Sequence, residues 1–125
     1  MKIEKLELKN CVSAEKSTSI LDLAKVVKEK GARNVLILEN DVLVGIVSIT
    51  DLVSKGFGQD EKDFEEINAE EIMTSPVFVV HMNDEVHTAL IAMMKKGLTS
   101  CPVVDDHEKC KGMVTINQLI EPNES

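Results

Sequence analysis

The chain repeats itself. Residues 20–31 match residues 86–97 at an offset of 66, and both stretches end in Lys-Gly. After one inserted residue, residues 45–53 match residues 112–120 at an offset of 67, with Gly, Val, Ile and Leu identical. Such a repeat constrains the fold strongly, because both copies must adopt the same order of elements. We predict one supersecondary unit that is built twice.

Hydrophobic periodicity assigns the elements of each copy. Apolar residues at i, i+3, i+4 and i+7 from Ile20 and from Val86 predict amphipathic helices, which Gly31 and Gly97 end. Short apolar runs around polar turns predict hairpins, and a second helix is expected to begin near Ser48 and its repeat partner. The predicted strands are residues 35–38 and 43–47 in the first copy and 103–104 and 113–114 in the second, preceded by residues 8–12 and 77–80.

Each copy is therefore β-α-β-β-α, and the fold class is mixed α+β. We place the first repeat at residues 1–56, an acidic connector that forms a solvated loop at 57–71, and the second repeat at 72–125. A core of this size is near the lower limit for independent folding. We expect the two copies to pack about a pseudo-two-fold axis.

Composition narrows the classes of function. A formal net charge of −8 disfavours nucleic acid, whose binding depends on Lys and Arg at phosphates. No stretch reaches the roughly 20 apolar residues that span a bilayer, and the start of the sequence lacks a signal-peptide core. Three irregularly spaced cysteines indicate reduced thiols in a cytoplasmic protein. Cys101, His107 and Cys110 do not have the spacing of a metal site, and no metal is expected.

Two segments carry a family resemblance. Residues 72–77, Ile-Met-Thr-Ser-Pro-Val, resemble the start of the second unit in a tandem cystathionine-β-synthase (CBS) domain pair, or Bateman module, of the small stand-alone kind. Residues 45–51, Gly-Ile-Val-Ser-Ile-Thr-Asp, resemble the family's motif Gly-x-x-Ser/Thr-x-x-Asp. The resemblance implies that AMP, ADP, ATP or S-adenosylmethionine binds in clefts between the paired units. It assigns phosphate to Ser48 and the ribose hydroxyls to Asp51.

The resemblance implies two sets of ligand-binding residues, one for each cleft. The first set is Cys11, Val12, Arg33, Asn34, Val35, Ser48, Ile49, Thr50 and Asp51. The second set is Pro76, Val77, Phe78, Ser100, Cys101, Pro102, Thr115, Asn117 and Gln118. The second copy departs from the motif, because Gln118 stands where the family has Asp. The first copy departs too, with Leu36 where the second has the family's Pro102.

The same residues have a structural interpretation. Ser48 with Asp51, like Thr115 with Gln118, suits a helix N-cap in which a hydroxyl accepts from the N–H three residues on. Arg33 suits a phosphate, but it also suits a solvated turn. The sequence leaves both alternatives open.

We expect a non-catalytic regulatory module that needs no cofactor and binds an adenine nucleotide or related adenosyl ligand. The alternative is a protein-protein assembly module with vestigial clefts. A catalytic triad or metal cluster is not recognisable in the sequence, which disfavours an enzyme. An apolar edge at Leu119 and Ile120, near the end of the last helix, favours a homodimer, and a further regulated protein partner is possible. The Met93-Met94 pair is expected in the core.

Overall fold

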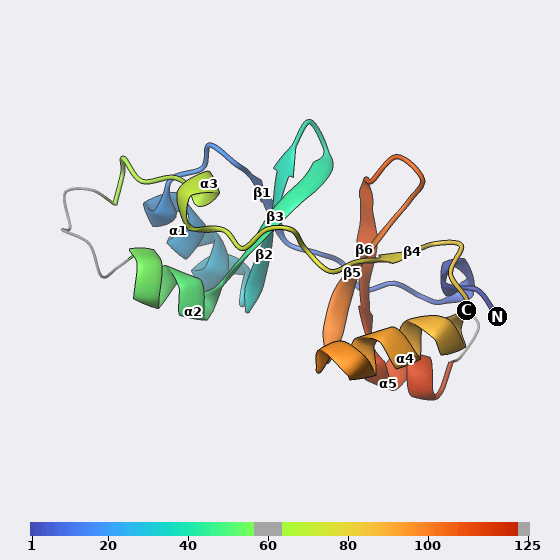
Figure 1. Ribbon diagram of the computed structural model, residues 1–125. Coiled ribbons are helices and arrows are strands. Elements are labelled where there is room, and N and C mark those ends of the chain that lie inside the picture. The colour runs from blue at the N-terminus through green and yellow to red at the C-terminus, as the bar shows by residue number, and fades with distance from the viewer. Residues whose placement is uncertain (57–63, 123–125) are drawn as a thin grey trace. The chain divides into compact units, whose positions relative to one another are not determined.

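The computed structural model describes residues 1–56 and 64–122 and has two three-stranded sheets (Figure 1). In each sheet the first strand runs parallel to the second, and the second pairs antiparallel with the third. This confirms the mixed α/β class and the duplicated hairpin. The strands are β1 (Ser13–Glu15), β2 (Asn34–Glu39) and β3 (Val42–Ser48) in one sheet, and β4 (Val80–His81), β5 (Ser100–Val104) and β6 (Cys110–Thr115) in the other.

The helices also follow the repeat. Helix α1 (Ile20–Lys30) begins after Ser19, whose hydroxyl accepts from the Asp22 N–H, and it ends at Gly31 with φ 63°. Helix α4 (Val86–Lys96) ends in the same way at Gly97 with φ 68°. Glycine is the usual residue in the left-handed conformation that ends a helix, because the backbone of a residue with a Cβ would be strained there. The shorter helices are α2 (Ile49–Asp51), continued by the π-helical turn η2 (Leu52–Gly56), then α3 (Ala69–Ile72) and α5 (Ile116–Ile120), with a 3₁₀ turn η1 (Ile3–Lys5).

The chain divides into two compact units, and the sequence of one is inserted between the two parts of the other. The inserted unit is Val12–Val77, and the outer unit is Met1–Cys11 together with Phe78–Ser125. Each unit has a hydrophobic core of its own, in which the helices pack against one sheet. These divisions differ from the sequence boundaries at 1–56 and 72–125, since the first eleven residues pack with the second repeat.

Each unit is completed by a stretch that we call its leading segment. This is the stretch around Ile3 and Leu6 in the outer unit and the stretch around Ala69 and Ile72 in the inserted unit. Ile3 and Leu6 are buried in the core of the outer unit, and Ala69 and Ile72, at the same offset of 66, are buried in that of the inserted unit. Both segments also pair with the start of a long helix: the Ile3 N–H donates to the Asp84 carbonyl, and the Ile20 N–H donates to the Ile67 carbonyl. The repeat therefore extends further toward the N-terminus than the sequence comparison recognised.

The prediction that the acidic connector forms a solvated loop was wrong in the part that the structure describes. Residues 57–63 lie outside the described residues, but Ala69–Ile72 forms helix α3 rather than a solvated loop. Phe64 and Ile67 pack against the core of the inserted unit. The many acidic residues in the sequence hid this, because only a few apolar side chains of the described part point inward, while Glu65, Glu66, Glu70 and Glu71 are exposed.

Two glycines let the leading segments approach the sheets. Thr74 pairs with Ile46 on β3, and Lys9 pairs with Met113 on β6. A Cβ on Gly45 would lie 2.7 Å from Met73 Cγ, and one on Gly112 would lie 2.8 Å from Leu8 Cβ and 2.9 Å from the Lys9 carbonyl oxygen. The repeated glycine is thus explained by close packing of a neighbouring segment.

The predicted first strand of each copy is displaced. Residues 8–12 were expected as a strand, but β1 is Ser13–Glu15, and Lys9 pairs with β6 instead. Residues 77–80 were expected too, but β4 is only Val80–His81. In the inserted unit the Leu36 N–H donates to the Val12 carbonyl beside β1. The matching residue of the outer unit is Pro102, which has no N–H to donate, so β4 begins later.

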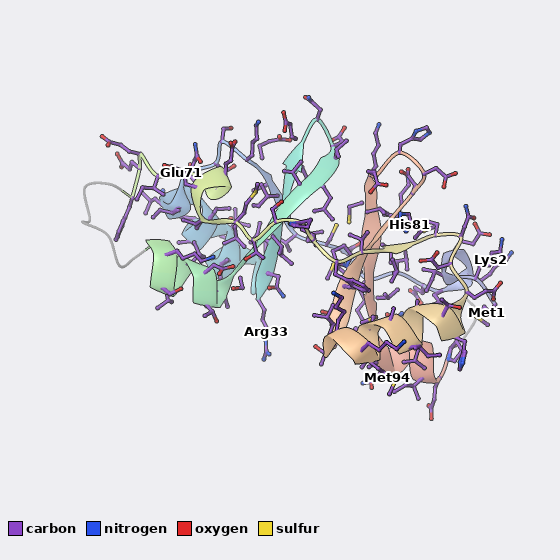
Figure 2. All side chains as sticks on the ribbon, viewed as in Figure 1. Met1, Lys2, Arg33, Glu71, His81 and Met94 are labelled. Atoms are coloured by element: carbon purple, nitrogen blue, oxygen red, sulfur yellow. The ribbon has the colours of Figure 1, made fainter. Side chains whose placement is uncertain are left out.

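Two predicted apolar pairs are divided between core and surface. Met93 is fully buried, as expected, but Met94 is 61% exposed on the outer face of α4 (Figure 2). Leu119 is buried and Ile120 is 56% exposed, so only Ile120 belongs to an apolar edge. Consecutive helical residues point about 100° apart, which is why neighbouring residues seldom share a face. In the described part of the chain, no helix is long and apolar enough to cross a membrane.

Candidate functional site

The turn between β3 and α2 holds the centre of the first predicted set. The Ser48 hydroxyl accepts from the Asp51 N–H at 3.0 Å, and Asp51 Oδ2 accepts from the Ser48 N–H at 3.0 Å. This reciprocal pair is a capping box, so the structural interpretation of the motif is correct. It does not exclude a ligand, because a carboxylate has about four acceptor positions and the box uses one of them.

The carboxylate of Asp51 is held in its charged form. Its side chain is 16% exposed, and Oδ1 lies 3.4 Å from Lys55 Nζ. Partial burial opposes ionisation, but hydrogen bonds from the backbone and side chain of Ser48, with the Lys55 charge, lower the pKa of Asp51 below its usual value. The sequence search missed Lys55, although its i,i+4 spacing from Asp51 is the signal for such a pair.

The depressed pKa of Asp51 predicts a pH effect on folding. A carboxyl whose folded pKa lies below its unfolded value stabilises the protein above the unfolded pKa, here about 3.8, and loses this contribution as pH falls through the folded value. We expect Asp51→Asn to be less stable than wild type at pH 6, with the difference shrinking between about pH 5 and pH 2. Urea unfolding across that range measures it. A difference in the free energy of unfolding that stays constant over this pH range would contradict the lowered pKa of Asp51.

Strand pairing gathers most of the first set around this turn. Asn34 lies opposite Ser48 in the β2–β3 register, and the Ile49 N–H donates to the Arg33 carbonyl at 3.0 Å. Val35 is buried, while Thr50 is exposed on α2. The Arg33 side chain extends away from the end of β2 (Figure 2). The backbone pairing thus brings Arg33, Asn34 and Ser48 to one end of the β2–β3 hairpin, directly before the half-buried Asp51 carboxylate.

Two residues of the first set, Cys11 and Val12, directly precede β1. Val12 lies beside the β2 edge through its carbonyl, which accepts from the Leu36 N–H at 2.8 Å. Cys11 belongs to the outer unit, where its Sγ lies 3.5 Å from Cys110 Sγ. Val12 therefore lies beside the strand that carries Asn34 and Val35, whereas Cys11 is part of the outer unit.

The second copy repeats the cap but uses its amide differently. Gln118 Oε1 accepts from the Thr115 N–H at 3.0 Å, and the Thr115 hydroxyl accepts from the Gln118 N–H. Gln118 Nε2 donates to the Glu7 carbonyl at 2.7 Å. The amide therefore fastens the leading segment of the outer unit. The link to Glu7 is invisible in the sequence, because 111 residues separate the partners.

The rest of the second set is divided between the two units. Ser100 lies opposite Thr115 in the β5–β6 register, and Asn117 is exposed on α5. Cys101 and Pro102 are buried. Pro76 and Val77 belong to the inserted unit and Phe78 to the outer unit, where Lys96 Nζ lies 5.9 Å from the centre of the Phe78 ring. A cleft of about 570 Å³ lies beside Gln118 and is lined by residues 6–10, with Glu121 at its edge.

The cysteines do not form a metal cluster with the other candidate ligands. Among residues 1–56 and 64–122, no group of three His, Cys, Asp or Glu side chains is placed to hold an ion. Burial raises the pKa of Cys101 to about 11, so this thiol is an ordinary core residue.

The fold and the two capped turns define a class of protein: a duplicated α/β module with a capped strand-to-helix turn in each copy. The chain belongs to the CBS domain family, whose profile matches residues 3–58 and 69–122. Both matched ranges include a leading segment, η1 in one and α3 in the other.

Curated relatives are mostly longer than this chain. Uncharacterized protein MK0525 of Methanopyrus kandleri is 32% identical over 114 residues, which are 90% of this chain and 58% of the relative. The L-aspartate semialdehyde sulfurtransferase of Methanocaldococcus jannaschii is 32% identical over 109 residues, which are 86% of this chain and 20% of that enzyme. Among solved structures, the CBS domain pair of protein MJ0100, in complex with 5′-methylthioadenosine and S-adenosyl-L-methionine, is 27% identical. It has a TM-score of 0.74, covering 96% of this chain and 93% of that one.

Proposed function

We propose that this chain is a non-catalytic regulatory module that binds an adenine nucleotide or related adenosyl compound through the β3–α2 turn of the inserted unit. The observation that carries the proposal is the half-buried Asp51 carboxylate, which Ser48 and Lys55 hold in its charged form at the end of the β2–β3 hairpin. A carboxylate can accept hydrogen bonds from both hydroxyls of a ribose, and charge-assisted bonds of this kind are strong. The adenosyl ligands of the related MJ0100 pair support the same class of ligand.

Differences between the copies favour the first turn over the second. Asp51 Oδ1 lies 3.4 Å from the Lys55 ammonium and keeps further acceptor capacity, since a carboxylate oxygen has two lone pairs. Gln118 already uses its amide oxygen and its amide nitrogen within the outer unit. An amide is also a weaker acceptor than a carboxylate. If one ligand binds, it binds at Asp51.

Direct binding tests the proposal. Isothermal titration calorimetry of the purified chain with AMP, ADP, ATP, S-adenosylmethionine and 5′-methylthioadenosine should give saturable binding with at least one compound. A thermal-shift panel checks it independently, because a ligand at 100 times its Kd adds about 2.7 kcal/mol to the free energy of unfolding. Binding to none of the five in both assays would contradict the proposal.

Exposed apolar side chains favour a second candidate function, assembly. On the outer unit they are Ile91 (41% exposed), Met94 (61%) and Ile120 (56%), and on the inserted unit Ile49 (42%) and Val53 (60%). Apolar side chains on helical faces are typical of contact surfaces between subunits. We propose a homodimer with a further regulated protein as partner. Native mass spectrometry distinguishes the functions, since it reports subunit number and any retained nucleotide in one spectrum.

A further inference from the structure

Two thiols meet where the leading segment crosses strand β6. Cys11 Sγ and Cys110 Sγ lie 3.5 Å apart although the residues are 99 positions apart in the sequence. Both side chains are half-buried and belong to the outer unit. The segment around Cys11 is already fastened there, because Lys9 and Met113 exchange both backbone hydrogen bonds, at 2.8 and 2.9 Å. A bonded pair needs about 2.05 Å between sulfurs, so formation of the bond requires the two sulfurs to approach by about 1.5 Å.

The matching positions of the inserted unit hold no sulfur. Val77 stands where Cys11 is found, and Leu43 stands where Cys110 is found. Aliphatic residues therefore occupy both of these positions in the other copy of the repeat. The two thiols are a property of one copy, and packing alone does not require them.

We propose that Cys11 and Cys110 form a reversible disulfide that locks the leading segment onto β6. The oxidant is a low-molecular-weight disulfide. A protein thiolate attacks one sulfur of the small disulfide and releases one small thiol, which leaves a mixed disulfide on the protein. The other protein thiol then loses its proton, attacks the protein sulfur of the mixed disulfide and releases the second small thiol. Two protein thiols become one disulfide, and the two electrons and two protons leave on the small thiols.

The surroundings of Cys110 set the pH dependence of these steps. Burial, followed by the hydrogen bond with Cys11, raises the pKa of Cys110 to about 11. Little of the Cys110 thiol is therefore ionised at neutral pH, so its attack on a disulfide becomes faster as pH rises. The lock restrains the chain directly before Val12, at the boundary of the two units. This inference is independent of the proposed nucleotide site.

Thiol counting tests the lock. The full chain is equilibrated with mixtures of reduced and oxidised glutathione, acid-quenched, unfolded and labelled with a maleimide. We expect three labels per chain under reducing conditions and one label, on Cys101, under oxidising conditions, with the chain monomeric on a non-reducing gel. Formation of the disulfide should accelerate as pH rises. The oxidised chain should melt roughly 10 °C above the reduced chain, because the bond closes a long loop.

Cys11→Val and Cys110→Leu are the matched controls, because each installs the residue of the other copy. Both variants should melt near reduced wild type, and neither should gain an internal disulfide or the increase in melting temperature. Three labels in every mixture, a glutathione adduct that is never resolved, a disulfide between chains or loss of the Cys101 label would each overturn the proposal.

Discussion

Gly112→Ala is expected to lower the free energy of unfolding by about 3 kcal/mol. Gly112 has φ 151°, a conformation that side chains rarely adopt, and an added Cβ would lie 2.9 Å from the Lys9 carbonyl oxygen and 2.8 Å from Leu8 Cβ. The neighbouring backbone is held in place by the Lys9–Met113 pair, so it cannot retreat without losing hydrogen bonds. Urea unfolding of the purified chain measures the loss.

Gly45→Ala is the control for this experiment. Gly45 occupies the same place in the other sheet, but a new Cβ there meets the Met73 side chain rather than backbone. A methionine side chain is flexible and can move aside, so we expect a loss of only about 1 kcal/mol. Equal losses in the two variants would show that backbone proximity at β6 is not what makes Gly112 necessary.

Asp51→Gln should weaken binding of the adenosyl ligand by about 10–150-fold, which corresponds to about 1.5–3 kcal/mol. The substitution removes the negative charge that would accept from the ribose hydroxyls. It keeps the helix cap, because Gln118 forms the same reciprocal pair with Thr115 in the other copy. Calorimetry gives the change in affinity, and urea unfolding should show a change in stability below about 1 kcal/mol.

Asp51→Ala is the companion variant, because it removes the cap and the charge together. We expect it to lose the same affinity and, in addition, about 1 kcal/mol of stability. Unchanged affinity in Asp51→Gln would contradict the proposed contact between Asp51 and the ribose, even if the ligand binds elsewhere on the chain. An affinity loss in Asp51→Ala alone would assign the effect to the cap.

Elements with strong local signals were predictable from the sequence. The helices α1 and α4 follow from apolar spacing and their glycine ends, and the hairpins follow from short apolar runs around polar turns. The cap at Ser48 was one of two stated interpretations, and the structure shows it. These features depend on residues within a few positions of one another.

Features set by distant residues were not predictable in the same way. The leading segment 1–11 packs on the second copy, although the sequence order places it with the first. Only Ile3 in the helical turn η1 and Leu6 directly after it are buried there, and two apolar residues are too few to show a period. Extending the offset of 66 backwards would have found the match with Ala69 and Ile72.

The candidate site was predictable to a similar extent. The resemblance gathered Arg33, Asn34 and Val35 with Ser48 and Asp51, and strand pairing places them together. The ligand roles of these residues remain a prediction. Neither the bond from Gln118 to Glu7 nor the contact of Cys11 with Cys110 could be found, because each joins residues about 100 positions apart.

The insertion of one unit into the other has a practical consequence for dissecting the protein. Residues 12–77 form a continuous stretch, so the inserted unit can be expressed as an uninterrupted piece with its own core. The outer unit cannot be expressed in this way. Ile3 and Leu6 belong to its core, but the whole inserted unit separates them in the sequence from residues 78–125. Residues 72–125 alone would leave that core open. To obtain the outer unit by itself, residues 1–11 must be joined to residue 78 by a linker or supplied as a separate peptide.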